Sequence, residues 1–540
     1  MTAISETITT APTRRDWLGL GALAAGLGMI VLDGTIVGVA LPAMVADLPL
    51  TLSDAQWVGS LYAAVLAALL LSAGRLADRW GRKRLFLVGI VVFMLGSLWA
   101  ATASGAGSLI AARAGQAIGA AMIMPSTLST VNATFRGKYR AAAFGVWGAV
   151  ISGAAAVGPL AGGALTQYAS WPWIFLVNLP LGTLVFVAAI FTVRETKDPL
   201  VGGRGGDVLG AVFSAIGFAA LVFVVIEGPD LGWWRPHEDF EVFGLIWPTT
   251  APVSLVVPLA VVAAFGIAGF LVWERRRARR GRPVLLDLTL FRLPTFRWGN
   301  LTAGTIAVGE FAIVFVLPLC LVNALGFDAM GAGLVLAAMA LGAFVSGALA
   351  RHLAQRLGAP GVVIAGLALE IVGIAWLVTV VGPGSGGWTL AIPLIVYGLG
   401  LGLASAQLTG TVLRDVPVAQ SGQGSATQST VRQVGSALGT ALAGAALSIT
   451  LAVTLPAAVS DAGLSGARVD SAVAATRSSA GATISALRAQ HGGAIVDALS
   501  AGFTDATRVA LLVAGVFLVL GLIGALRVRA VARHPALSHP

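Results

Sequence analysis

The stretch Gly74-Arg75-Leu76-Ala77-Asp78-Arg79-Trp80-Gly81-Arg82-Lys83-Arg84 separates two apolar runs, residues 55–73 and 85–104. Each run has about the 20 residues that an α-helix needs to cross roughly 30 Å of hydrocarbon. The stretch between them is short and places one carboxylate among five cations, and loops rich in Lys and Arg lie on the cytoplasmic side of a membrane. It therefore predicts two membrane helices joined by a tight cytoplasmic turn.

The rest of the chain follows the same pattern. Of its 540 residues, 57% are hydrophobic and 11% are charged, whereas about a quarter are charged in an average soluble domain. Apolar runs of about 20 residues alternate with short polar breaks, and the sequence lacks the successive alternating segments of about ten residues that a membrane β-barrel needs. We therefore predict an all-α integral membrane protein with 14 transmembrane helices.

A weak internal repeat divides these helices into two halves. The segment 74–78, after the second run, recurs at 347–351 after the tenth. We predict an N-terminal six-helix bundle at 17–193, a two-helix insert with flanking loops at 194–296, and a C-terminal six-helix bundle at 297–528 with an external loop at 456–504. The tails are 1–16 and 529–540. The predicted spans are 17–41, 55–73, 85–104, 109–133, 141–165, 173–193, 207–226, 251–273, 297–322, 331–350, 361–381, 390–412, 430–455 and 505–526.

The basic residues predict the orientation. With an even number of spans, 27 Lys and Arg side chains fall on one side and five on the other, while Arg113 and Arg432 fall inside apolar runs. Cytoplasmic loops carry such an excess. We expect a multi-pass protein of the cytoplasmic membrane with both termini in the cytoplasm and with the arginines at 275–282 against anionic membrane lipid.

The remaining composition argues against several classes of function. The net charge of +10 does not indicate a nucleic-acid partner, because the cations are confined to alternate loops. The single cysteine, Cys320, cannot form an intrachain disulfide, and the five histidines have no metal-ligand spacing. The sequence also lacks a nucleotide-binding P-loop. We expect no metal and no cofactor, and the proton-motive force as the energy source.

Two ionisable residues of the N-terminal half lie well inside apolar runs, Asp33 and Arg113. Burying either one costs at least a few kcal/mol. At 1.5 Å per residue their depths differ by only a few ångströms, which predicts that they pair. The pair is either a static salt bridge or a proton-sensitive contact near the path of a substrate. Gln116, one turn after Arg113, either lines a polar cavity or makes a hydrogen bond between packed helices.

Two acids of the C-terminal half, Glu310 and Glu370, are also buried in apolar runs. Glu310 has no basic residue near it in its own run, so we expect an unpaired acid that is ready to hold a proton. The alternative is a protonated side chain that hydrogen-bonds to a neighbouring helix. Glu370 is a weaker candidate of the same kind.

The fifth run has small residues at helical spacing on one face, and Gly158-Pro159 interrupts its helical hydrogen bonding. On physical grounds such a face lets two helices pack closely. The residues on this face are Gly148, Ser152, Ala155, Pro159 and Gly162.

Several of these segments resemble a known family. The stretch 74–84 resembles the signature loop of the major facilitator superfamily. Segments 32–42, 113–119, 171–180 and 429–439 resemble its fourteen-span drug:proton antiporters, although Gly38 stands where Asn is usual. The segment 153–163 resembles the motif that marks exporters in the superfamily. Lys138-Tyr139-Arg140 departs from the pattern, because many relatives have an acidic residue at its middle position.

The resemblance implies roles for particular residues. Asp33 and Arg113 would take part in coupling and proton transfer. Asp78 would hold a cytoplasmic gate closed, within a gating loop formed by Gly74, Asp78, Arg79, Gly81, Arg82 and Lys83. The antiporter helix would present Gly148, Ser152, Gly158, Pro159, Gly162 and Gly163.

We therefore expect a monomeric secondary transporter that exports small amphiphilic, cationic organic molecules in exchange for protons, by rocking of two bundles about a central cavity. The alternatives are an importer, a dedicated exporter of one natural product or lipid, and a membrane enzyme or scaffold. An enzyme would need a clustered catalytic set at one membrane depth, and the sequence has none.

Overall fold

The computed structural model describes residues 12–135, 138–197, 207–242, 245–282, 284–417, 420–490 and 492–533. Within these residues the chain is almost entirely helical, and 14 helices are long and apolar enough to cross a membrane. This confirms the predicted fold class. Helices dominate because the hydrocarbon offers no partner for a backbone N–H or C=O, and an α-helix satisfies these groups within its own segment.

The N-terminal bundle contains six spans, the last of which is broken. Its elements are α1 (Arg14–Asp47), α2 (Leu52–Trp80), α3 (Arg82–Ala101), α4 (Ala106–Thr134), α5 (Lys138–Tyr168), and the pair α6 (Trp173–Leu176) and α7 (Asn178–Thr192). Thr13 and Thr51 begin α1 and α2 with capping boxes, in which Asp16 and Asp54 return the hydrogen bond.

The two-helix insert and the C-terminal bundle follow. The insert consists of α8 (Val208–Leu231), a hairpin of β1 (Phe240–Val242) and β2 (Leu245–Trp247), and α9 (Val256–Arg279). The C-terminal bundle contains η2 (Leu288–Arg292), α10 (Pro294–Leu319), η3 (Cys320–Ala324), α11 (Ala329–Leu357), α12 (Ala359–Val380), α13 (Gly387–Val412), α14 (Ser421–Asp461), α15 (Ala467–Ser478), α16 (Ala482–Ala489) and α17 (Gly493–Arg533).

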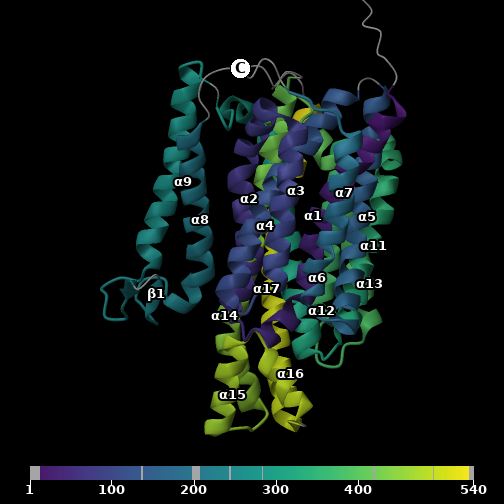
Figure 1. The fold of residues 1–540 in the computed structure, drawn as a ribbon. Coiled ribbons are helices and arrows are strands. Elements are labelled where there is room, and N and C mark those ends of the chain that lie inside the picture. Colours follow the sequence, from purple (N-terminus) through teal and green to yellow (C-terminus); the bar gives the residue numbers. More distant parts are fainter. Residues whose placement is uncertain are drawn as a thin grey trace, which may run out of the picture.

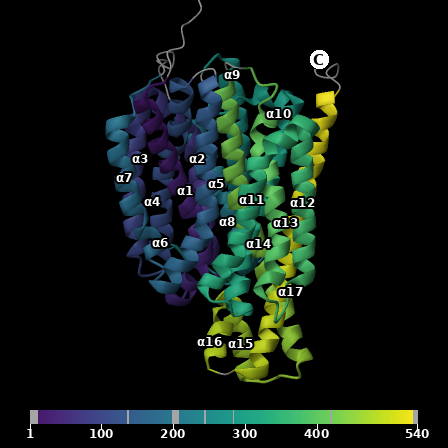
Figure 2. The same ribbon diagram turned by 90° about the vertical axis from the view of Figure 1, so that its right-hand side faces the viewer.

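The stretch that we expected to be an external loop, 456–504, is largely helical. It contains the end of α14, the short helices α15 and α16, and the beginning of α17. The stretch is rich in Ala, which has the highest helix propensity of all residues. These helices project beyond the rest of the molecule in both views (Figures 1 and 2).

The molecule has two ends, the cap end and the terminal end. The cap end carries α15 and α16, and the terminal end carries the beginning of α1 and the end of α17, as Figure 2 shows. The N-terminal bundle, in purple and blue, and the C-terminal bundle, in green and yellow, stand side by side in that view. The membrane-spanning helices run between the cap end and the terminal end, as Figure 2 shows.

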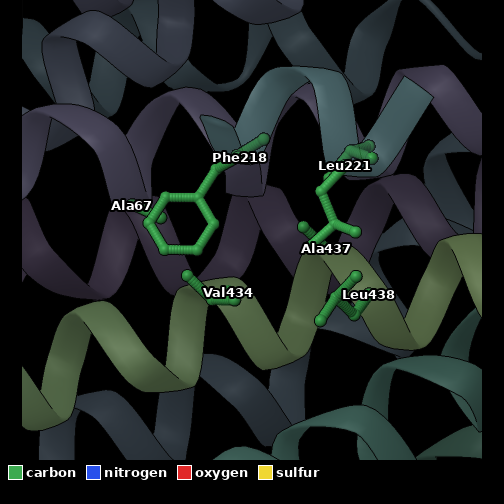
Figure 3. A pocket seen from close by; sticks show the side chains of 8 residues that line it. Ala67, Phe218, Leu221, Val434, Ala437 and Leu438 are labelled. Atoms are coloured by element: carbon green, nitrogen blue, oxygen red, sulfur yellow. The ribbon is translucent and has the colours of Figure 1, made fainter. Parts of the chain in front are cut away.

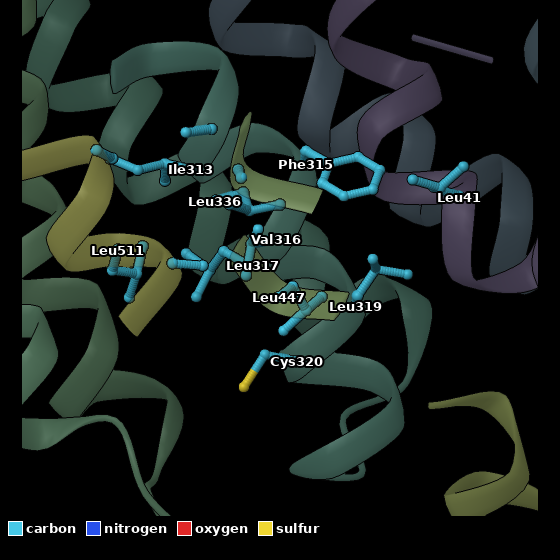
Figure 4. Packing of buried hydrophobic residues seen from close by; sticks show 14 of the residues in the cluster. Leu41, Ile313, Phe315, Val316, Leu317, Leu319, Cys320, Leu336, Leu447 and Leu511 are labelled. Atoms are coloured by element: carbon cyan, nitrogen blue, oxygen red, sulfur yellow. The ribbon is translucent and has the colours of Figure 1, made fainter. Parts of the chain in front are cut away.

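A continuous apolar core joins the two bundles near the cap end. Figure 4 shows Phe315 and Leu319 of α10 between Leu41 of α1 and Leu447 of α14. All four belong to one cluster of buried side chains that draws residues from both halves of the chain. The core of the N-terminal bundle nearer the terminal end forms a separate cluster.

The insert stands beside the bundles, with α8 next to α2 and α14 (Figure 1). Its two helices are joined near the terminal end by an ion pair, Arg277 Nε to Asp207 Oδ2 at 3.0 Å, and Trp273 Nε1 donates to Asp207 Oδ1 at 2.7 Å. The predicted spans 207–226 and 251–273 correspond to these helices, although α8 extends to Leu231 and α9 begins later, at Val256, and extends to Arg279.

Candidate functional site

The centre of the N-terminal bundle contains a buried ion pair between α1 and α4. Arg113 Nη1 lies 2.6 Å from Asp33 Oδ2, and the two side chains are 2% and 0% exposed. This is the contact that the helix depths predicted. Since both charges are removed from solvent, the loss of either would leave the other uncompensated in a medium of low polarity.

Further donors complete the coordination of the Asp33 carboxylate. Its Oδ1 accepts hydrogen bonds from Gln116 Nε2 at 3.1 Å and from Asn178 Nδ2 at 2.9 Å. Both amides also donate to the hydroxyl of Ser97, at 2.7 and 3.2 Å. The network therefore connects α1, α3, α4 and α7, and it makes Gln116 a bridging residue of a buried network.

Aromatic rings and a carbonyl hold the guanidinium of Arg113 from the other side. Its Cζ lies 4.2 Å from the centre of the Tyr62 ring and 5.9 Å from that of Phe175. Its Nε donates to the carbonyl oxygen of Val58 at 3.3 Å. Cation–π contacts strengthen when the cation is desolvated, so α2 and α6 also contribute to holding this charge.

Glu310 has a partner, which corrects the expectation from the sequence. Arg432 Nη2 of α14 lies 3.5 Å from Glu310 Oε2 of α10. The side chains are 37% and 23% exposed, respectively, so this pair is less buried than that of Asp33. The expectation was wrong because it considered only the helix that carries Glu310, whereas the partner lies 122 residues further along the chain.

Glu370 of α12 is fully buried, and neither of its carboxylate oxygens has a hydrogen-bond donor among the residues that the structure describes. It lies within electrostatic range of Glu310 and Arg432. The hydroxyl of Tyr397 on α13 is buried in the same way without a partner among the described residues. The C-terminal bundle thus carries two acids and one arginine in a single group.

The predicted gating loop is tied to its own bundle. Arg82 donates to Asp78 Oδ1 through Nε at 2.9 Å and lies 2.8 Å from the same oxygen through Nη2. Its Nη1 donates to the carbonyl oxygen of Ser129 in α4 at 3.2 Å. Lys83 Nζ donates to the carbonyl oxygen of Ile190 in α7 at 2.6 Å. The loop therefore fastens α2 and α3 to α4 and α7.

Glycine at position 81 is required by this loop for two reasons. Its φ is +125°, a conformation that residues with a Cβ rarely adopt. A Cβ would also lie 2.6 Å from Glu195 Oε1, and this carboxylate accepts the backbone N–H groups of Lys83 and Arg84 at 3.1 and 3.3 Å. A Cβ at Gly74 would lie 3.5 Å from Pro125 Cβ, an ordinary van der Waals distance, and Arg79 is exposed.

The antiporter helix, α5, contacts both bundles at the positions singled out in the sequence. A Cβ at Gly158 would overlap Thr35 of α1, and one at Gly162 would lie 3.0 Å from the carbonyl oxygen of Ile36. A Cβ at Gly333 of α11 would lie 2.6 Å from the carbonyl oxygen of Pro159, so Pro159 meets the C-terminal bundle. Gly148 and the side chain of Ser152 lie outside the part of the chain whose surroundings the structure describes.

One face of α5 meets α11 at the cap end and is open towards the terminal end. A Cβ at Gly163 would lie 2.8 Å from the carbonyl oxygen of Ala329, and Gln167 Oε1 accepts from the N–H of Ala329 at 3.2 Å. Gly145 precedes Gly163 by five turns and therefore lies on the same face, about 27 Å away. A Cβ at Gly145 would meet no described atom within 4 Å. This face of α5 thus contacts α11 at the cap end, and at Gly145 it has free space among the described atoms.

Several residues of the site were not singled out as candidates from the sequence. Asn178 and Arg432 lie in segments on which the resemblance to the family rests. The signal that could have identified them is a polar side chain within an apolar run. Glu195 had no such signal, because it follows the last residue of α7, where charged residues are common.

Comparison with known proteins gives a consistent result. The family model described as Major Facilitator Superfamily matches residues 23–440. A probable actinorhodin transporter of Streptomyces coelicolor is 32% identical over 86% of this chain and 78% of its own length. The multidrug resistance protein Stp of Mycobacterium tuberculosis is 31% identical over 79% and 75% of the two chains.

A solved structure agrees with this fold. A bacterial homolog of the human lysosomal transporter Spinster, in an inward-facing and unoccupied conformation, superposes with a TM-score of 0.61 and covers 96% of this chain and 98% of its own. At 17% identity this likeness concerns the fold alone.

Proposed function

The chain belongs to the major facilitator superfamily, and we propose that it exports small amphiphilic, cationic organic compounds across the cytoplasmic membrane in exchange for protons. Relatives named as a multidrug resistance protein and as a probable antibiotic transporter support export of drugs or antibiotics. On this proposal it is a transporter and not an enzyme. It acts as a monomer in contact with membrane lipid, and its partners are protons and small molecules, without a cofactor.

Its orientation follows from the basic residues. The loops and tails that the sequence assigns to the side of the terminal end contain 27 Lys and Arg, against five for the side of the cap end, so we assign the terminal end to the cytoplasm. A reporter fused after Arg282 should then report the cytoplasm, and one inserted near Ser479 should report the outside. An external location for Arg282 would refute both the orientation and the two-span insert.

Alternating access accounts for the relation between the bundles. With the terminal end in the cytoplasm, the state seen here faces inward, because α5 contacts α11 at Gly163 and is open at Gly145. Export requires the opposite state, in which the cap end opens and the terminal end closes. The gating loop around Asp78 would act on this exchange, since its contacts fasten the helices of one bundle into a unit that moves together.

Proton coupling rests on a single observation, the Asp33 carboxylate buried beside Arg113 at the centre of its bundle. A buried acid can attract a cationic substrate or hold a proton, but a proton cancels the charge that attracts the cation. That competition would couple the movement of the proton to the movement of the substrate. The second group, Glu310 with Arg432 and Glu370, would hold further protons, because the carboxylate of Glu370 is buried without a hydrogen-bond donor among the described residues.

A dedicated exporter of one natural product is the second candidate, and it has an observation in its favour. The relative from Streptomyces coelicolor is named for a single compound, actinorhodin. Transport of a panel of unrelated amphiphiles would separate the two candidates, because a dedicated exporter should move only one of them or its close analogues.

The decisive experiment uses purified protein in liposomes with an imposed pH gradient. A fluorescent cationic dye should accumulate against its gradient on the side with the lower pH, and the accumulation should collapse when an ionophore removes the gradient. Dye movement that ignores both the pH gradient and the membrane potential would refute proton coupling while leaving facilitated transport possible.

A further inference from the structure

Helix α8 of the insert lies across the seam where the two bundles meet. In Figure 3, Phe218 and Leu221 of α8 point towards Ala67 of α2 and towards Val434 and Leu438 of α14. The cavity between them has about 10 Å³, about the space for one water molecule. The three helices are therefore packed against each other, and this region is not a space for a substrate.

Polar contacts follow at the cap end of the same seam. Asp230 Oδ2 accepts a hydrogen bond from Ser53 Oγ of α2 at 2.5 Å, and Asp230 Oδ1 accepts from Ser448 Oγ of α14 at 3.5 Å. One carboxylate of the insert thus bridges the N-terminal and the C-terminal bundle. A second one, Glu227 Oε1, accepts from Trp57 Nε1 of α2 at 2.6 Å.

We propose that α8 is a clasp that holds the cap end closed, and that Asp230 is a positioning residue for outward opening. The inference rests on the alternating access proposed above, in which α2 and α14 separate at this end. The contacts also predict how the clasp releases. Glu227 and Asp230 hold α2 through two short hydrogen bonds, whereas α14 has one long hydrogen bond. The bond of Ser448 therefore breaks, and α8 moves with the N-terminal bundle.

The charges around the clasp decide which variants test it. Asp54, Asp230 and Glu238 lie within electrostatic range of Glu227, so Asp230→Ala removes the hydrogen-bond acceptor and also relieves repulsion between acids. Asn is unsuitable here, because its amide could still bond to the hydroxyl of Ser448. Ser448→Ala removes the same bond from the α14 side without a change of charge. Agreement between the two variants would therefore assign the effect to the bond.

The test measures how often each end opens, in purified protein in lipid nanodiscs, where both faces are open to reagent. Cys320 is the only cysteine, so Cys320→Ala gives a background for single reporters. Gly59→Cys places a thiol at the seam, where a Cβ would lie 3.5 Å from Thr440 of α14. Gly145→Cys places one on the open face of α5. The reagent is a charged maleimide, which reacts only with thiols that reach water.

Asp230→Ala and Ser448→Ala should each increase the labelling rate at Gly59→Cys, by roughly fivefold for the loss of the hydrogen bond between Asp230 and Ser448. Both should decrease labelling at Gly145→Cys, because one end closes when the other opens. The control is Asp505→Asn, a carboxylate near the cap end that pairs with Arg508 within α17.

Three outcomes would overturn the clasp. The first is an unchanged rate at Gly59→Cys in both variants. The second is an increase at both reporters, which would indicate looser packing and not a shift between two states. The third is an equal effect of Asp505→Asn. The assay contains neither substrate nor pH gradient, so its result does not depend on whether dye export by the same protein succeeds.

Discussion

Replacement of Asp33 by Asn tests whether the central ion pair does more than hold helices together. The carboxylate accepts from Arg113, Gln116 and Asn178, and an amide in its place would turn one acceptor into a donor that faces another donor. Arg113 would remain as a buried cation without a counter-charge. Breaking a buried pair in this way typically costs about 3–5 kcal/mol. We expect a clear fall in thermal stability in detergent.

A second substitution separates stability from coupling. The double variant Asp33→Asn/Arg113→Met has neither charge. In the parent protein Arg113 Nη1 donates to Gln116 Oε1 at 2.8 Å. The amide nitrogen of the asparagine at position 33 can donate to this oxygen in its place. Replacing a buried pair by neutral groups of similar volume is often close to neutral for stability. We expect the double variant to unfold near the temperature of the parent protein, with a coupling energy of several kcal/mol between the two sites.

Transport decides between the two roles of the pair. At a saturating substrate concentration, the double variant should still exchange labelled substrate for unlabelled substrate across the liposome membrane, because that exchange needs no net proton movement. Its affinity for a cation should be lower, since the charge that attracts the cation is gone. It should lose accumulation driven by a pH gradient. Normal accumulation by a stable double variant would refute the coupling role and leave Asp33 and Arg113 as a static salt bridge. Arg113→Met alone is the control for the loss of the arginine, since Asp33 keeps its charge and can still accept hydrogen bonds from the amides of Gln116 and Asn178.

Three further predictions concern the gate, the second acid and the contact between α5 and α11. Asp78→Asn should change the rate of exchange between the two states and leave substrate affinity intact, because its contacts are with Arg82 in the loop; lower affinity with a normal exchange rate would refute this role. Glu310→Gln should weaken the response of transport to membrane potential at zero pH gradient, where each extra charge moved adds about 2.3 kcal/mol per 100 mV. A full response at normal protein abundance would make Glu310 a packing residue. Gly163→Ala should push α5 away from α11 and increase the spin-label distance between their cap ends, whereas Gly145→Ala, whose Cβ meets no described atom within 4 Å, should leave that distance unchanged.

The candidate site was predictable from the sequence only in part. Asp33 and Arg113 could be paired because each lies in a helix that must start at a membrane surface, so residue counts give their depths. This argument could not identify Asn178 and Ser97, because uncharged polar residues occur in many membrane helices. Arg432 was visible as a charge inside an apolar run, but its contact with Glu310 depends on which helices are neighbours.

The sequence by itself determined the number of spans, their helical structure and the residues that carry charge inside them. The physical reason is local, because any segment in hydrocarbon must satisfy its own backbone hydrogen bonds. Only the tertiary structure decided which helices touch: that α8 bridges α2 and α14, that Glu310 meets Arg432, and that α5 meets α11 at Gly163. Side chains that face lipid and side chains that face another helix are equally apolar. Hydrophobicity therefore places a residue in the membrane without choosing its neighbour.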